Sequence, residues 1–265
     1  MRLLCTVFIF LCATFSTNAQ VTSWDLEALE LERRIYAADS LAAHNEAVLA
    51  KAEVRKQQGL YREALSELSR VRPYALDEEG LTAYYYERAL VGYLAGDFDL
   101  SLGAIDERRI YLPGRAEEPM LLLVEALAAG EKGDWERSQK AAIHYASTHP
   151  NSEELTHTLT ELYEDTPRLR NPEVAYWLSL VPGLGQLYAG EVWSGLVSLV
   201  ANGALATFGV SEMMAGQWLS GWIVGCGGLS TTFFVGQERA RTLTERHNTR
   251  ALRTHNDLLR QQLLR

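Results

Sequence analysis

Cysteine is scarce in this chain, with three among 265 residues, at Cys5, Cys12 and Cys226. Metal-binding spacings are absent as well: there is no Cys-x-x-Cys and no His-Glu-x-x-His, and the six histidines are scattered. No grouping of nucleophile, base and oxyanion donor stands out either. We therefore expect no intramolecular disulfide, no metal, no cofactor and no enzymatic activity.

Positive charge is also in short supply, with 25 Lys and Arg against 34 Asp and Glu. The deficit is uneven, because residues 174–237 contain no Lys or Arg at all, while the segment from Glu238 carries seven arginines against three acids. The acidic surplus therefore lies in the first part of the chain. An acidic surface there argues against nucleic acid as a partner, since phosphate binding needs a positive field.

The pattern of a β-strand is missing too, since no stretch alternates apolar and polar residues with period two. The N-terminus instead begins with Arg2, an apolar run over 3–15 and Thr17-Asn18-Ala19, which is typical of an export signal and its cleavage site. We predict a signal peptide over residues 1–19; an uncleaved membrane anchor is the alternative. The mature chain is predicted to be all helical.

Three pairs of a glycine and an aromatic two residues later are separated by a constant interval of 37 residues. The pairs are Gly59 and Tyr61, Gly96 and Phe98, and Gly133 and Trp135. Small residues recur in phase on both sides: Ala52, Ala89 and Ala126 before the glycines, and Ala64, Ser101 and Ser138 after the aromatics. This period predicts stacked helix–turn–helix units, with each glycine ending a first helix and each aromatic beginning a second.

The pattern resembles the tetratricopeptide repeat over about residues 45–150, with Pro113 and Pro150 at the closing-proline position. It departs from that family in its longer period and in the first unit, where Leu76 replaces the closing proline. The resemblance implies a helical solenoid of three units plus caps, whose concave face binds protein or peptide, and it implies no catalysis. The candidate partner-binding residues are Glu53, Lys56, Tyr86, Tyr93, Leu123 and Leu127. A solvated face for the charged pair, and gap-filling between repeats for the tyrosines, are the alternatives.

Two uncharged stretches, 192–210 and 218–235, are each about long enough to cross a bilayer as a helix. Both are rich in small residues, which let membrane helices pack closely. We expect a transmembrane hairpin; buried core helices of a soluble domain are the alternative. The expected organisation is a signal peptide (1–19), a helical-repeat domain (20–165), a linker (166–173), a membrane hairpin domain (174–237) and a basic amphipathic tail helix (238–265).

A second motif, Pro-Gly-Leu-Gly-Gln-Leu-Tyr-Ala-Gly, precedes the hairpin at 182–190. It is similar to an element of small bacterial membrane hairpin domains found in envelope proteins. Proline and glycines break a helix here, and Gln186 and Tyr188 can satisfy the freed backbone groups. We expect a structural turn, with a ligand or lipid-headgroup site as the alternative. The motif residues are Pro182, Gly183, Gly185, Gln186, Tyr188 and Gly190.

These features together predict an exported, membrane-anchored adaptor of the bacterial cell envelope that binds a protein or peptide. Its location would be the inner membrane, with the repeats on the periplasmic side. The alternative function is a structural or accessory subunit of an envelope complex, with its contacts in the hairpin. We expect two crossings, with 174–189 half-buried against the hairpin. A third crossing by that segment is the alternative, because it would place the basic tail in the cytoplasm, as the positive-inside rule prefers.

Overall fold

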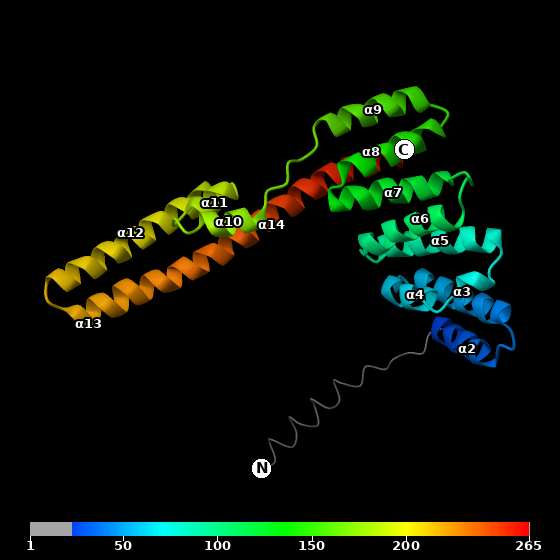
Figure 1. Cartoon of the computed structure of the whole chain (residues 1–265), viewed down its shortest axis with the longest axis horizontal. Helices are drawn as coiled ribbons and strands as arrows, with labels where there is room; N and C mark the ends of the chain where they lie inside the picture. Colours follow the sequence, from blue (N-terminus) through cyan, green and yellow to red (C-terminus); the bar gives the residue numbers. More distant parts are fainter. Residues whose placement is uncertain (1–22, 265) are drawn as a thin grey trace, which may run out of the picture. The chain divides into compact units, whose positions relative to one another are not determined.

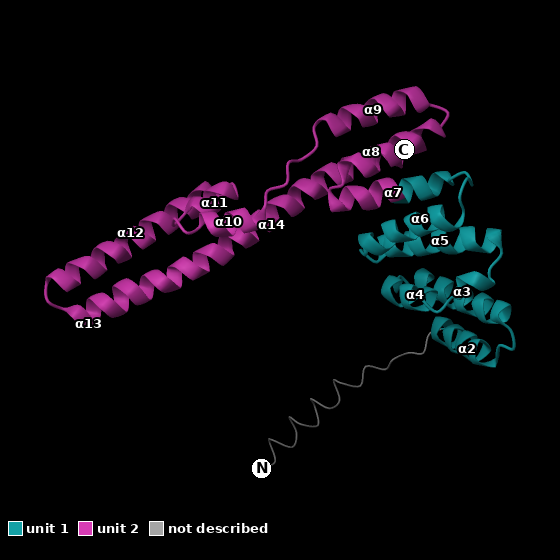
Figure 2. Cartoon of the chain, viewed as in Figure 1, with its two compact units in different colours: residues 1–124 teal, residues 125–265 magenta. Residues whose placement is uncertain are grey.

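The computed structural model describes residues 23–264, and these residues form helices and connecting turns without a strand. The all-α expectation is confirmed for this part of the chain (Figure 1). The predicted signal peptide, 1–19, lies outside the described residues. Two compact units divide the chain at Val124 and Glu125 (Figure 2). This boundary falls inside a helix, whereas the sequence suggested a division near residue 165.

Unit 1 consists of consecutive helices joined by short turns. They are α2 (Ser23–Ala37), α3 (Leu41–Gln57), α4 (Tyr61–Leu68), η1 (Pro73–Ala75), α5 (Glu78–Leu94), α6 (Phe98–Tyr111) and the first part of α7 (Pro119–Lys132). Sequence neighbours pack on each other: α2 on α3, α3 on α4, α4 on α5 and α5 on α6. The predicted helix starts at Tyr61 and Phe98 are confirmed.

Each repeated glycine ends a helix in the left-handed region, with φ of 75° at Gly59, 76° at Gly96 and 73° at Gly133. The amide of each donates to a carbonyl three residues back, at 2.9, 3.0 and 3.0 Å respectively. Side chains other than glycine resist this backbone conformation. The constant spacing of the glycines therefore reflects one turn geometry used three times.

The small residues also make the same contact in two of the repeats. The Ser101 hydroxyl donates to the Ala89 carbonyl at 2.7 Å, and 37 residues later the Ser138 hydroxyl donates to the Ala126 carbonyl at 2.7 Å. All four residues are buried. Their small size lets two helices of a pair approach closely enough for a side chain to reach the neighbouring backbone.

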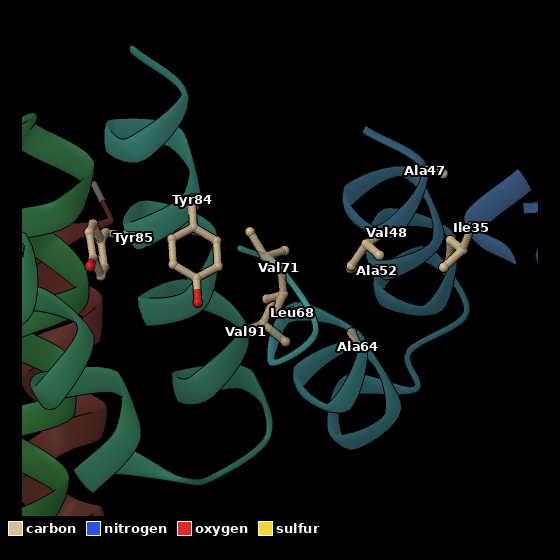
Figure 3. Packing of buried hydrophobic residues seen from close by; sticks show 10 residues of the cluster. All are labelled: Ile35, Ala47, Val48, Ala52, Ala64, Leu68, Val71, Tyr84, Tyr85 and Val91. Carbon is tan, nitrogen blue, oxygen red and sulfur yellow. The ribbon is translucent and has the colours of Figure 1, made fainter. Parts of the chain in front are cut away.

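The core of the first helices is an apolar layer contributed by α2, α3, α4 and α5 (Figure 3). Its members include Ile35, Val48, Leu68, Tyr84 and Val91. The same helices carry a largely buried charged cluster. Lys51, 8% exposed, contacts Glu32 at 2.5 Å and Glu67 at 2.6 Å, and Arg70 contacts the same two carboxylates. The charges are therefore paired, as burial requires.

Unit 2 begins with the rest of α7 and continues through α8 (Trp135–Ser147) and α9 (Ser152–Glu164), which pack on each other. Two short helices follow, α10 (Pro172–Leu178) and α11 (Leu184–Tyr188). The remaining elements are α12 (Val192–Met214), α13 (Trp218–Ser220), the π-helical turn η2 (Gly221–Gly227) and α14 (Gly228–Leu263). The predicted tail helix, 238–265, is thus the continuation of one helix that starts at Trp218.

Helix α12 and the helix from α13 to α14 lie side by side as a long apolar helix pair (Figure 1). Glycines set the closest approach: a Cβ added to Gly209 would lie 2.8 Å from the Cα of Gly225. Elsewhere along the pair, the Thr232 hydroxyl of α14 donates to the Asn202 side-chain oxygen of α12 at 2.7 Å. Both helices are long and apolar enough to cross a membrane, and they are the two such helices among residues 23–264.

The C-terminal part of α14 packs back onto α7, α8 and α9. Leu259 and Leu263 are buried there, and the ring of His255 meets the rings of Trp135 and Tyr163 edge-on at 4.7 and 5.7 Å. Arg260 pairs with Glu131 of α7. The tail helix therefore covers the last helix pair.

Candidate functional site

A groove in unit 1 lies between α3 and α5 and encloses a cavity of about 240 Å³. Its lining is largely apolar and includes Leu49, Ala83 and Tyr84. Two carboxylates, Glu53 and Glu87, also reach the cavity from facing helices. A mostly apolar hollow with a few placed polar groups is the usual form of a binding site.

Lys56 joins the two carboxylates of the groove. Its ammonium lies 2.6 Å from Glu53 and 2.8 Å from Glu87. Burial by itself lowers the pKa of Lys56, but hydrogen bonds to both carboxylates outweigh burial, and the net effect raises that pKa. Burial likewise opposes ionisation of Glu53, whereas hydrogen bonds from Lys56 and Gln57 outweigh it and lower the pKa of Glu53. Glu53 and Lys56 are therefore charged near neutral pH, and the rim brings two carboxylates to one ammonium.

The two tyrosines expected in the groove expose only part of their side chains to a partner. Tyr86 and Tyr93 are half-buried and pack against the apolar cluster of α5, α6 and α7. Burial, followed by the nearby charge of Glu87, raises the pKa of Tyr86. Both tyrosines thus fill space between helices, and Tyr86 also borders the charged rim.

Two other expected partner contacts, Leu123 and Leu127, are buried on α7, at 5% and 7% exposure. Side chains this buried have little surface to offer a partner. Glu53 and Lys56 form an ion pair beside the groove, and Glu87, which was not among the expected contacts, joins it. No pattern in the sequence marks it, since Glu87 lies 31 residues from Lys56 and meets it only through the fold.

The Pro-Gly-x-Gly-Gln-x-Tyr-x-Gly motif lies in unit 2, where α10 packs on α11 and α14, and α11 packs on α12 and α14. Gly183 has φ of 93°, and a Cβ there would lie 2.4 Å from the Gly195 carbonyl oxygen. At Gly185, an added Cβ would lie 1.9 Å from the Ser179 hydroxyl. These two glycines are therefore needed for the close packing of the elbow that α10 and α11 form.

The polar residues of the motif satisfy backbone groups. The Gln186 side-chain amide donates to the Gly236 carbonyl at 3.0 Å, and the Tyr188 hydroxyl accepts from the Asn171 amide at 3.1 Å. Arg170 donates to the Tyr188 carbonyl at 2.8 Å and lies against Gly190. Pro182 lines a small closed space with Gln186. The motif thus forms part of the connection between α10 and α12, in which the Gln186 side-chain oxygen is buried without a hydrogen-bond partner.

Among residues 23–264, no group of three His, Cys, Asp or Glu side chains is placed to hold a metal ion. No protein-family model, curated protein or solved structure matches the chain. The physical features of the groove and of the apolar helix pair are therefore the basis for a functional assignment.

Proposed function

We propose that this chain is a membrane-anchored adaptor with tetratricopeptide-like helix pairs, which binds a protein or peptide partner in the groove between α3 and α5. The observation that carries the proposal is the cavity lined by Glu53 and Glu87, with Lys56 between the two carboxylates. An apolar floor beside a charged rim suits an extended peptide, because apolar side chains anchor the peptide and charges orient it.

The second half of the proposal is that α12 and the 218–235 segment form a transmembrane hairpin. Its outward residues are apolar and exposed, among them Trp193, Val200, Trp218 and Trp222. Contiguous exposed apolar surface of this kind needs a covering, and the segment lengths suit a bilayer. Glycine contacts and the Asn202–Thr232 hydrogen bond are the packing devices of membrane helices.

The proposed topology has two crossings. Helices α10 and α11 have seven and five residues, too short for either to cross, since a span needs about 20 residues. The docking of α14 on α8 and α9 also requires the tail and that helix pair to lie on one side. With the predicted signal peptide, that side is the periplasmic face of a bacterial inner membrane.

The adaptor function is tested by placing a photo-crosslinking amino acid at Ala83, which is exposed and lines the groove. The matched control is the same amino acid at Arg62, an exposed position on α4 outside the cavity lining. In native membranes we expect a discrete crosslinked partner from position 83 and none from position 62. Crosslinks formed only from Trp222 would instead support the accessory-subunit function.

A further inference from the structure

A second cavity, of about 670 Å³, lies in unit 2 between α9 and the C-terminal part of α14. Its size falls within the range of ligand-binding pockets. Leu162 on α9 and Ala251 and Leu258 on α14 supply apolar lining. The cavity does not involve the α3–α5 groove, so it is a separate candidate for binding.

The charge of this cavity is negative. Glu161 and Asp165 both line it, and no lysine or arginine does. Asp165 is the C-cap of α9, where the carbonyl ends of the helix add negative potential. Both carboxylates are exposed beside an apolar surface, and the nearest paired group is the exposed His157 ring, 3.6 Å from Glu161.

His255 gives independent support for a ligand. It lines the cavity, is 5% exposed, and its Nε2 atom has no hydrogen-bond partner. Burial lowers the pKa of His255, although the charge of Asp165 acts in the opposite direction. The imidazole is therefore neutral at pH 7 and leaves the negative charge of the cavity in place. A buried polar nitrogen without a partner is costly unless something pairs with it.

We propose that this cavity binds a basic side chain, lysine or arginine, of a partner polypeptide. The methylene stem would lie on Leu162, Ala251 and Leu258, and the charged head would lie at Glu161 and Asp165. Long basic side chains have this division between an apolar stem and a charged tip. A metal ion is a poorer match, because Glu161, Asp165 and His255 are not placed as a group that could hold one.

The test uses the full chain in nanodiscs of phosphatidylcholine, whose lack of net charge limits binding of a basic probe to lipid. The probes are two fluorescein-labelled amides, leucine-lysine-leucine and leucine-norleucine-leucine, which differ in the terminal ammonium. Fluorescence polarisation should show at least tenfold tighter binding of the lysine peptide. Raising the salt concentration should reduce this preference, because salt screens charges near the surface.

Two paired variants locate the site. E161Q with D165N should weaken lysine-peptide binding at least tenfold. E153Q with E154Q removes the same charge from exposed positions of α9 that do not line the cavity, and should leave binding unchanged. Circular dichroism confirms equal folding of the variants. Equal affinity for the two peptides, or an unchanged affinity of E161Q with D165N, would overturn the proposal. Equally tight binding of spermidine would assign the cavity to a free polyamine and overturn the peptide assignment.

Discussion

At the scale of single residues, the hydrogen bond from Ser101 to the Ala89 carbonyl tests the repeat geometry. Ser101→Ala removes one buried hydrogen bond without changing the space much, and alanine occupies the matching position in the first repeat, at Ala64. We expect a loss of about 1 kcal/mol in the free energy of unfolding, measured by pulse proteolysis of the full chain in nanodiscs.

The control is Ser69→Ala, which removes an exposed hydrogen bond to the Ser66 carbonyl. Its expected effect is within about 0.5 kcal/mol of zero, as for most surface changes. Equal losses from the two substitutions would contradict the view that the repeated small residues are packing devices.

The charged cluster around Lys51 predicts a particular response to acid. Hydrogen bonds from Arg70 and then Lys51 lower the pKa of Glu32 from 4.5 to about 2, although burial opposes this shift. Because the folded pKa lies below the unfolded one, the stabilisation is complete above pH 4.5. It is lost as the pH falls towards 2. The shift corresponds to at most about 3 kcal/mol, and solvent screening reduces it.

Glu32→Gln should therefore lower the free energy of unfolding at pH 7. It should also make that free energy vary less with pH between pH 4.5 and pH 2. Thermal melting across this pH range provides the measurement, with Glu30→Gln as the control, because Glu30 lies on the same helix in an exposed pair with Arg33. If the melting temperatures of Glu32→Gln and of the unmodified chain fell in parallel between pH 4.5 and pH 2, the proposed role of this carboxylate would be ruled out.

At the scale of helices, the contact between Gly209 and Gly225 sets how closely α12 approaches η2. Gly209→Leu should push the two helices apart and cost about 1–3 kcal/mol, because an added Cβ already lies 2.8 Å from the Gly225 Cα. Gly203→Leu is a matched control on the same helix, since a Cβ there meets nothing within 4 Å. Thermal unfolding in nanodiscs should separate the two variants, and identical midpoints would contradict the packing seen here.

Helix boundaries were largely predictable because they depend on local chemistry. Glycines with positive φ at 59, 96 and 133, and the aromatics two residues later, mark the turns in the sequence itself. The burial of Leu123 and Leu127 was not foreseen, since apolar residues on a helix can face either a core or a groove. The packing of His255 and Leu259 could not be predicted from the sequence either, because their contacts lie on helices more than 90 residues earlier.

At the scale of the whole molecule, cysteine labelling tests the proposed number of membrane crossings. In a chain with Cys226→Ser, single cysteines at Thr254 and at Arg62 report the sides of the tail and of the helix pairs; both positions are exposed. We expect both to react with a membrane-impermeant thiol reagent in intact cells whose outer barrier has been opened. The reason is that α14 docks on α8 and α9 after two crossings.

Labelling of the Thr254→Cys chain only after lysis, with Arg62→Cys labelled before it, would show a cytoplasmic tail and a third crossing. The positive-inside rule favours that outcome, since the tail carries seven arginines. Two crossings nevertheless agree better with the packing, because the aromatic contacts of His255 and the buried Leu259 require α8 and α9 beside the tail.

The return of α14 to α7 and α8 has a consequence for the order of events on the ribosome. Tyr145 and Leu263 are separated by 118 residues, and Glu131 and Arg260 by 129. At about 5–20 residues per second, α8 emerges several seconds before the helix that covers it. During that interval the two apolar segments of 192–235 are synthesised, and under the proposed topology they would be inserted into the bilayer. Completion of the last helix pair would thus report that insertion has succeeded, and a chain stalled at the translocon would expose an uncovered apolar face to quality-control proteases.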